Sequence, residues 1–96
     1  MRLSDFEIAT IKQNTQKIFG DTSEIFLFGS RVDDNKKGGD IDLYIKTQDA
    51  QKIFDKKSQF LLSLQDQIGD QKIDIIVSTD PMREIEREAI KTGVKL

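Results

Sequence analysis

The fold of this chain is organised around residues 25–45, which read IFLFGSRVDDNKKGGDIDLYI. Four large apolar residues open the stretch, a pattern typical of a strand buried on both faces. From Asp40 onward, polar and apolar residues alternate, which predicts a second strand with two unlike faces. Asp40 and Asp42 should project to one side, while three apolar residues anchor the other: Ile41, Leu43 and Ile45. Neighbouring carboxylates repel each other, and a bound divalent cation is the usual way to relieve that repulsion.

The first strand ends at Gly29-Ser30, and a hairpin-like return would bring this pair beside Asp40. Gly29 has no Cβ, so the backbone there can approach a ligand closely. The Ser30 hydroxyl and nearby N–H groups are suited to donate to phosphate oxygens, especially if a short helical turn begins at Ser30. The alternatives are an ordinary turn at Gly29-Ser30 and a solvent-facing pair at Asp40 and Asp42.

A third carboxylate, Asp74, lies in the run Lys72–Val77. Its apolar neighbours indicate a largely buried strand, in which an isolated carboxylate costs several kcal/mol unless it is paired or neutralised. Local N–H groups or a lysine are possible partners. Beside two other carboxylates, however, a metal site is the favoured interpretation, and Asp74 strengthens that case most.

Composition limits the kinds of site that this chain can build. It has 96 residues, which we interpret as a single domain over residues 1–96, with 36% hydrophobic and 33% charged residues. Cysteine and histidine are both absent. Disulfides, thiolate or imidazole metal sites and a serine–histidine triad are therefore excluded, and oxygen ligands point to magnesium, manganese or calcium.

Charge and N-terminal sequence give two expectations about partners and location. The net charge is −2 with both signs interspersed, so we expect no direct binding to nucleic acid. Residues 1–5 lack the apolar core of a signal peptide, and no apolar run approaches membrane-spanning length. A cytoplasmic location without membrane association is expected.

Periodicity and capping signals predict the order α-β-β-α-β-α, an α+β domain with helices packed on a small mixed sheet. Ser4 and Glu7 form a capping box for the first helix, and Gly20 ends it. A stripe on the second helix should face the sheet, with Phe54 and Phe60 beside it: Ile53, Lys57, Leu61, Leu64 and Ile68. The expected elements are a helix from Ser4 to Gly20, strands 24–28 and 40–45, a helix 49–68, a strand 73–77, a helix from Pro81 to about 92, and a tail or short edge strand 94–96.

The spacing of Gly29-Ser30, Asp40-Ile41-Asp42 and Asp74 resembles the nucleotidyltransferase superfamily of DNA polymerase β. It is most similar to minimal nucleotidyltransferase (MNT) domains, the single-domain bacterial and archaeal members that include antitoxins. The resemblance spans nearly the whole chain and implies the nucleotidyltransferase fold. Residues 32–34 depart from the usual pattern, in which Gly-Ser-Arg is followed by a small residue, an arginine and a glycine.

The resemblance also implies roles for individual residues. Asp40, Asp42 and Asp74 would be both the catalytic residues and the ligands of Mg²⁺ or Mn²⁺. Gly29, Ser30 and Arg31 would bind the nucleotide, ATP or another nucleoside triphosphate. Tyr44 lies on the strand face of the aspartates, where it either lines the nucleotide pocket or packs.

Minimal members of this superfamily are often paired with a helical HEPN-domain protein in a toxin–antitoxin pair. By resemblance, this chain would be a protein adenylyltransferase that moves AMP from ATP to a hydroxyl of that partner, in a hetero-oligomer. The alternative is a binding module that neutralises its partner by contact alone. The intact set of Ser30, Asp40, Asp42 and Asp74 favours catalysis, although the presence of metal ligands does not prove turnover.

Overall fold

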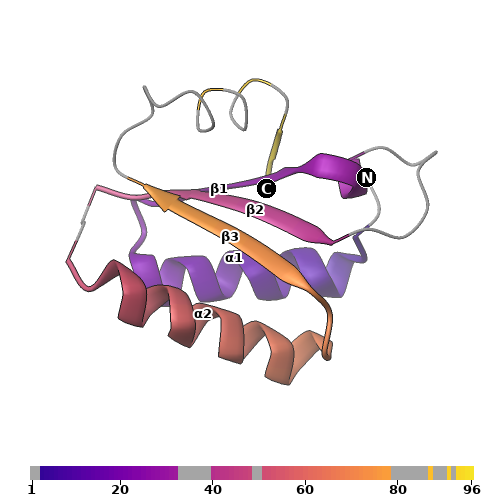
Figure 1. Ribbon diagram of the computed structural model, residues 1–96, viewed down its shortest axis with the longest axis horizontal. Helices are drawn as coiled ribbons and strands as arrows, with labels where there is room; N and C mark the ends of the chain where they lie inside the picture. The colour runs from indigo at the N-terminus through magenta and orange to yellow at the C-terminus, as the bar shows by residue number, and fades with distance from the viewer. Residues whose placement is uncertain (1–2, 33–39, 49–50, 79–86, 88–90, 92) are drawn as a thin grey trace.

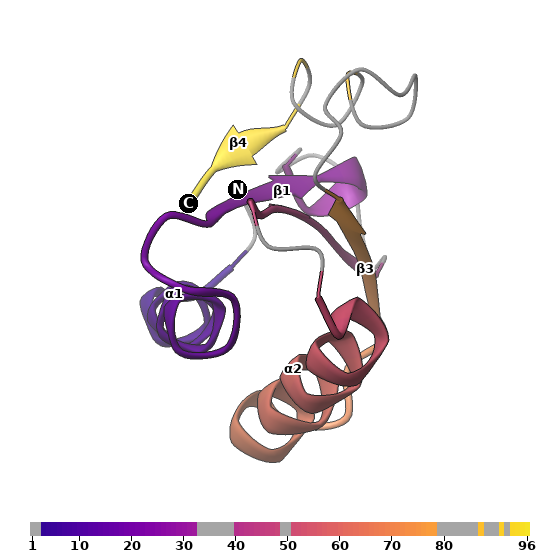
Figure 2. The same cartoon turned by 90° about the vertical axis from the view of Figure 1, so that its left-hand side faces the viewer.

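A four-stranded mixed sheet with two helices on one face forms the structure, a computed structural model that describes residues 3–32, 40–48, 51–78, 87, 91 and 93–96 (Figures 1 and 2). The sheet order is β3-β2-β1-β4, with β1 antiparallel to β2 and β4 and with β2 parallel to β3. The α+β prediction is confirmed. The elements are α1 Asp5–Phe19, β1 Glu24–Phe28, the 3₁₀ helix η1 Gly29–Val32, β2 Ile41–Lys46, α2 Ile53–Ile68, β3 Ile73–Ser78 and β4 Val94–Lys95.

Helix α1 begins and ends where its sequence predicts. The backbone N–H of Glu7 donates to Ser4 Oγ at 3.1 Å, and the N–H of Ser4 donates to Glu7 Oε1 at 2.9 Å. This reciprocal pair is the predicted capping box. At the other end Gly20 has φ +99°, a conformation that disfavours residues with a Cβ, and the helix stops there.

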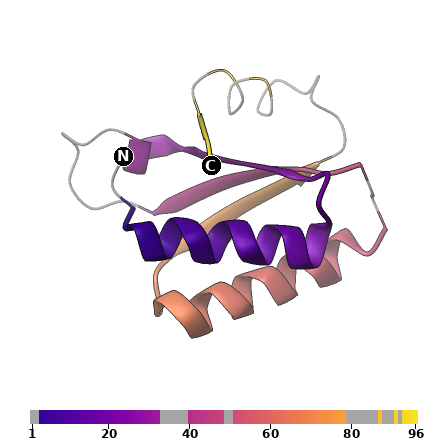
Figure 3. The ribbon, with the colours of Figure 1, turned by 180° about the vertical axis from the view of Figure 1, so that it is seen from behind.

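The main core lies between the sheet and the two helices, which Figure 3 shows side by side beneath the strands. Alternate strand residues point into it from β1, β2 and β3, so the predicted two-faced character of β2 is confirmed. Phe19 of α1 and Phe60 of α2 meet edge to face with ring centroids 5.8 Å apart. The buried members of this core are Ile11, Phe19, Ile25, Leu27, Ile41, Leu43, Ile45, Phe60, Leu64, Ile73 and Ile75.

The opposite sheet face carries a smaller apolar cluster. Phe26 and Tyr44 are buried there, their ring centroids are 5.9 Å apart, and the partly buried Phe28 and Ile76 pack against them. Tyr44 is completely buried. Of the two roles considered for Tyr44, packing is therefore the one that the structure supports.

The boundaries of three elements differ from the prediction. Helix α2 begins at Ile53 instead of near residue 49, because Lys52 adopts the left-handed conformation with φ +55° and cannot continue a helix before it. Strand β2 begins one residue after Asp40, and β3 continues to Ser78. Phe54, predicted to lie beside the packed stripe of α2, is 85% exposed.

The C-terminal region is described only in part. The predicted last helix runs from Pro81 to about residue 92, and most of this range lies outside the described residues. Within it, Arg87 and Lys91 are described, and both are helical. Val94–Lys95 forms the short edge strand β4 that was one of the two predicted alternatives. No helix among the described residues has the length and apolar character needed to cross a bilayer.

Replacing Leu64 with alanine tests the core between α2 and the sheet. Leu64 is completely buried, so Leu64→Ala should lower the free energy of unfolding by about 2–5 kcal/mol. Leu62, on the same helix, is 67% exposed, and Leu62→Ala should change it by less than about 0.5 kcal/mol. Urea denaturation of the two variants measures both. Equal losses would contradict the assignment of the buried face of α2.

Candidate active site

The register of the sheet brings Asp42 and Asp74 together. Asp42 of β2 lies directly opposite Asp74 of β3 in the parallel pair. Residues paired in this way have side chains on the same face of a sheet. That face is opposite α1 and α2, because the alternate residues Ile41 and Leu43 belong to the main core. The two carboxylates therefore meet on the sheet face opposite α1 and α2.

Asp40 joins this group from the residue just before β2. The N–H of Ile41 donates to the carbonyl of Lys72 at 3.0 Å, so the pairing of β2 with β3 is anchored at the end where Asp40 stands. Asp40 is two residues from Asp42 and projects to the same side of the strand. We call Asp40, Asp42 and Asp74 the aspartate cluster.

The prediction about the surroundings of Asp74 is wrong in one respect. Its strand is buried on the core side only, where Ile73 and Ile75 are 7% and 6% exposed, and Asp74 itself is exposed. Burial therefore imposes no large free-energy cost on Asp74. The observation that associates Asp74 with the other two carboxylates is instead its register opposite Asp42.

The backbone at Gly29 lies against the Asp42 side chain of the aspartate cluster. It begins η1 with φ +77°, and a Cβ placed on it would collide with Asp42 Oδ2 and lie 3.1 Å from Asp42 Cγ. Both the backbone conformation and the space therefore require glycine here. The sequence placed Gly29-Ser30 beside Asp40, whereas the structure places Gly29 beside Asp42.

The short helical turn predicted at Ser30 is present as η1, which starts one residue earlier. Only the backbone of Ser30 and Arg31 belongs to the described part, and their side chains do not. The phosphate-binding roles of these two residues stay predictions.

Lys72 also belongs to this site, although the sequence patterns above did not single it out. Its Nζ lies 3.3 Å from Asp40 Oδ2. This hydrogen bond and the negative charges of Asp40, Asp74 and Asp42 raise the pKa of Lys72. The signal was available in the sequence: Lys72 stands two residues before Asp74, so it projects to the same sheet face.

Negative charge is concentrated at Asp42. Partial burial raises the pKa of Asp42 above its ordinary value, and the charges of Asp74 and Asp40 raise it further. A hydrogen bond with the Asp74 carboxyl acts in the same direction, while Lys72 partly opposes these effects. A carboxylate surrounded by like charge is favourable for a divalent cation, because the cation offsets the repulsion.

The donor set fits Mg²⁺ or Mn²⁺ in chemistry, since hard cations take carboxylate oxygens. In the arrangement seen across the described ranges, no group of three or more Asp or Glu side chains is positioned to hold an ion. In this arrangement Asp40 is paired with Lys72. The assignment of Asp40, Asp42 and Asp74 as metal ligands and catalytic residues stays a prediction.

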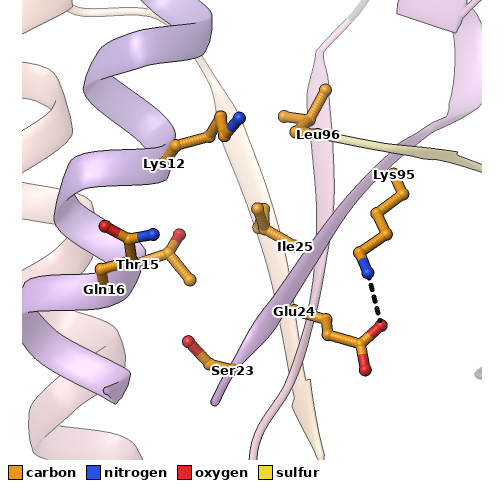
Figure 4. A pocket seen from close by; sticks show the side chains of 8 residues that line it. All are labelled: Lys12, Thr15, Gln16, Ser23, Glu24, Ile25, Lys95 and Leu96. Carbon is orange, nitrogen blue, oxygen red and sulfur yellow. Dashed lines mark ion pairs between the residues drawn. The ribbon is translucent and has the colours of Figure 1, made fainter. Parts of the chain in front are cut away.

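A separate hollow of about 60 Å³ lies on the helix side of the sheet, between α1 and the edge formed by β1 and β4 (Figure 4). Ligand pockets are usually about 300–1,000 Å³, so this hollow is too small for a nucleotide. Its lining shares no residue with the aspartate cluster: Lys12, Thr15, Gln16, Ser23, Glu24, Ile25, Lys95 and Leu96.

Comparison with known proteins gives one family match. The model of the family described as "Polymerase beta, Nucleotidyltransferase" matches residues 7–96 of this chain. The match includes Gly29 and the whole aspartate cluster. A search of curated proteins found no match.

Gly29→Ala tests the contact between η1 and Asp42. Alanine at φ +77° is strained by about 1–2 kcal/mol, and its Cβ would also displace the Asp42 carboxylate. We expect lower thermal stability together with weaker binding of Mn²⁺ in titration calorimetry. Gly69, with φ +94° and no atom within 4 Å of the position that a Cβ would occupy, is the matched control. Gly69→Ala should lower stability through strain alone and leave Mn²⁺ binding unchanged. If both variants behave alike, Gly29 has no special relation to Asp42.

Asp42→Asn tests the charge at the centre of the cluster. The folded-state pKa of Asp42 is raised above 3.8, so protonated Asp42 is favoured in the folded protein. The contribution of this group to the free energy of unfolding is therefore complete below pH 3.8 and is lost as the pH rises through the raised pKa. With a chelator at neutral pH, Asp42→Asn should therefore be more stable than the parent. Like charges opposite each other on neighbouring strands cost about 0.2–1 kcal/mol, which is the gain expected.

The gain should disappear when thermal unfolding is repeated near pH 3, where Asp42 is protonated in the parent. Asp21→Asn, in the exposed turn after α1, should show no comparable gain at neutral pH. An Asp42→Asn variant that is less stable than the parent at neutral pH would contradict the proposed repulsion.

Proposed function

The chain belongs to the polymerase beta nucleotidyltransferase family, and we propose that it transfers AMP from ATP to a hydroxyl group of a HEPN-domain partner protein. In this proposal it acts as the antitoxin of a toxin–antitoxin pair. The observation that carries the proposal is the register that sets Asp42 opposite Asp74, with the Gly29 backbone beside them. This arrangement supports the proposal, because the carboxylates would serve as cation ligands and the backbone N–H groups of the glycine turn would bind phosphate.

The carboxylates have separate roles in this proposal. Asp40 and Asp42 would hold Mg²⁺ or Mn²⁺ together with phosphate oxygens of ATP, and Asp74 would complete the ligand set. The ion, when bound, supplies charge stabilisation for the phosphoryl oxygens. Lys72 must then leave Asp40, and its 74% exposed side chain has room to do so.

Asp74 would also act on the acceptor. Its carboxylate is exposed, so an incoming hydroxyl group can reach it. As the acceptor oxygen forms its bond to the α-phosphorus of ATP, the hydroxyl proton would pass to Asp74. The bond between the α-phosphorus and the bridging oxygen breaks, and pyrophosphate leaves. Backbone N–H groups of η1, with Ser30 and Arg31, would hold the phosphates that depart.

A protein acceptor suits the small size of the domain. Large apolar side chains are exposed on α2, where Phe54 is 85% and Leu62 is 67% exposed. Such residues are suited to contact another protein. The same observation favours the second candidate function, a module that neutralises its partner by contact without transfer.

Incubation with ATP labelled in the α-phosphate, Mg²⁺ and the partner that co-purifies with the chain distinguishes the two functions. A transferase should add one nucleotide mass to the partner, detected by mass spectrometry, and release one pyrophosphate. Asp40→Ala and Asp42→Ala should reduce labelling by more than about a hundredfold, because each removes a cation ligand.

The same variants should still bind the partner in a pull-down, since neither carboxylate belongs to the main core. Asp21→Ala, which alters an exposed carboxylate in the turn before β1, should label the partner like the parent. A binding module predicts the opposite result: no mass shift with any nucleotide, and neutralisation unaffected by either substitution in the cluster.

A further inference from the structure

Lys72 is the one cation that forms an ion pair with the aspartate cluster among the described residues. Its Nζ lies 3.3 Å from Asp40 Oδ2, and it also interacts electrostatically with Asp74 and Asp42. Its backbone is fixed, because its carbonyl accepts the N–H of Ile41 at 3.0 Å. Its side chain is 74% exposed, so the ammonium group is held at the cluster by charge and can move away.

We propose that Lys72 is a built-in counter-cation of the aspartate cluster, which a divalent cation displaces from Asp40, so that Lys72 sets the affinity of the site for the metal. This inference rests on the proposed metal-dependent function. Without the ion, the ammonium group offsets part of the repulsion among three carboxylates. With the ion bound, the same positive charge repels it and competes with it for Asp40 Oδ2.

The second ion pair on the sheet provides a comparison. Lys95 Nζ lies 3.4 Å from Glu24 Oε2 at the β4 edge, with side-chain exposures of 61% and 37%, against 74% and 34% for Lys72 and Asp40. The two pairs are nearly equal in length and exposure. They differ in their charged surroundings. Asp40 has two carboxylate neighbours in the aspartate cluster, whereas Glu24 lies on β1, which is separated from β3 by β2 and pairs with β4 on its other side.

The proposal makes opposite predictions for the two states of the site. In chelator, Lys72→Met removes a compensating charge, and the variant should unfold at a lower temperature than the parent. With Mn²⁺ added, the competition is gone, and the variant should bind the ion more tightly. An ion pair with a purely structural role accounts for the first effect and not for the second.

Titration calorimetry with Mn²⁺ alone, at fixed ionic strength, measures the affinity. Lys72→Met should bind Mn²⁺ roughly three- to tenfold more tightly than the parent, the size expected when one positive charge is removed near a divalent ion in a solvent-exposed site. Lys72→Arg keeps the charge and should bind within about twofold of the parent. Lys95→Met should lose similar stability in chelator and leave Mn²⁺ affinity unchanged. Raising the salt concentration should reduce the difference between Lys72→Met and the parent.

An Asp42→Asn variant in the same series separates two kinds of failure. If the parent binds Mn²⁺ in a manner that Asp42→Asn abolishes, and Lys72→Met binds it no more tightly, the role of Lys72 is refuted and the metal site stands. If no binding depends on Asp42, both the metal site and the counter-cation role are refuted. Tighter binding by Lys95→Met, equal to that of Lys72→Met, would also overturn the inference, because the effect would then reflect net charge.

Discussion

The parallel pairing of β2 with β3 is the constraint on which the rest of the structure depends. It matches Asp42 with Asp74 and, on the other face, Leu43 with Ile75. Side chains alternate along a strand, so a slip of one residue would turn the carboxylates of one strand into the main core and its apolar residues toward solvent. Burial of Leu43 and Ile75 therefore fixes the positions of Asp42 and Asp74. The apolar packing on one face specifies the chemistry on the other.

The two faces of the sheet explain why a domain of this size tolerates an acidic group. Helices α1 and α2 pack on the face opposite the aspartates, and their contacts with the sheet make up the main core. The carboxylates do not interrupt the main core, because they lie on the other face of the sheet. On their own face, the smaller apolar cluster around Phe26 and Tyr44 lies farther along the strands. Repulsion at Asp42 is a local cost that packing elsewhere offsets, and glycine at position 29 avoids the strain that φ +77° would impose on a residue with a Cβ. This repulsion supports the proposed cation-dependent function, because a bound divalent cation would offset it.

Patterns local in sequence predicted most of the fold. The capping box at Ser4 and the alternation from Asp40 each depend on neighbours within a few residues, and both were confirmed. The start of α2 was missed because Lys52 adopts φ +55°, and a lysine gives no sign of that conformation in the sequence. The exposure of Phe54 was missed for a related reason: helical periodicity places Phe54 near the packed stripe, but periodicity does not show how far along the helix the packing extends.

Long-range pairing determined what local patterns could not predict at the site. Asp74 was assigned to the cluster from its apolar neighbours, yet it is exposed, and the association comes from a register that only the folded sheet defines. The spacing of Lys72 and Asp74 indicates that they share a sheet face, but the partner of Lys72, Asp40, is distant in sequence and becomes its neighbour only when β2 and β3 pair. The sequence indicates a functional role for Gly29. Its proximity to the Asp42 side chain, however, depends on the antiparallel pairing of Phe28 with Asp42. The sequence thus identifies which residues carry charge or lack a side chain, and the strand register decides which of them act on one another.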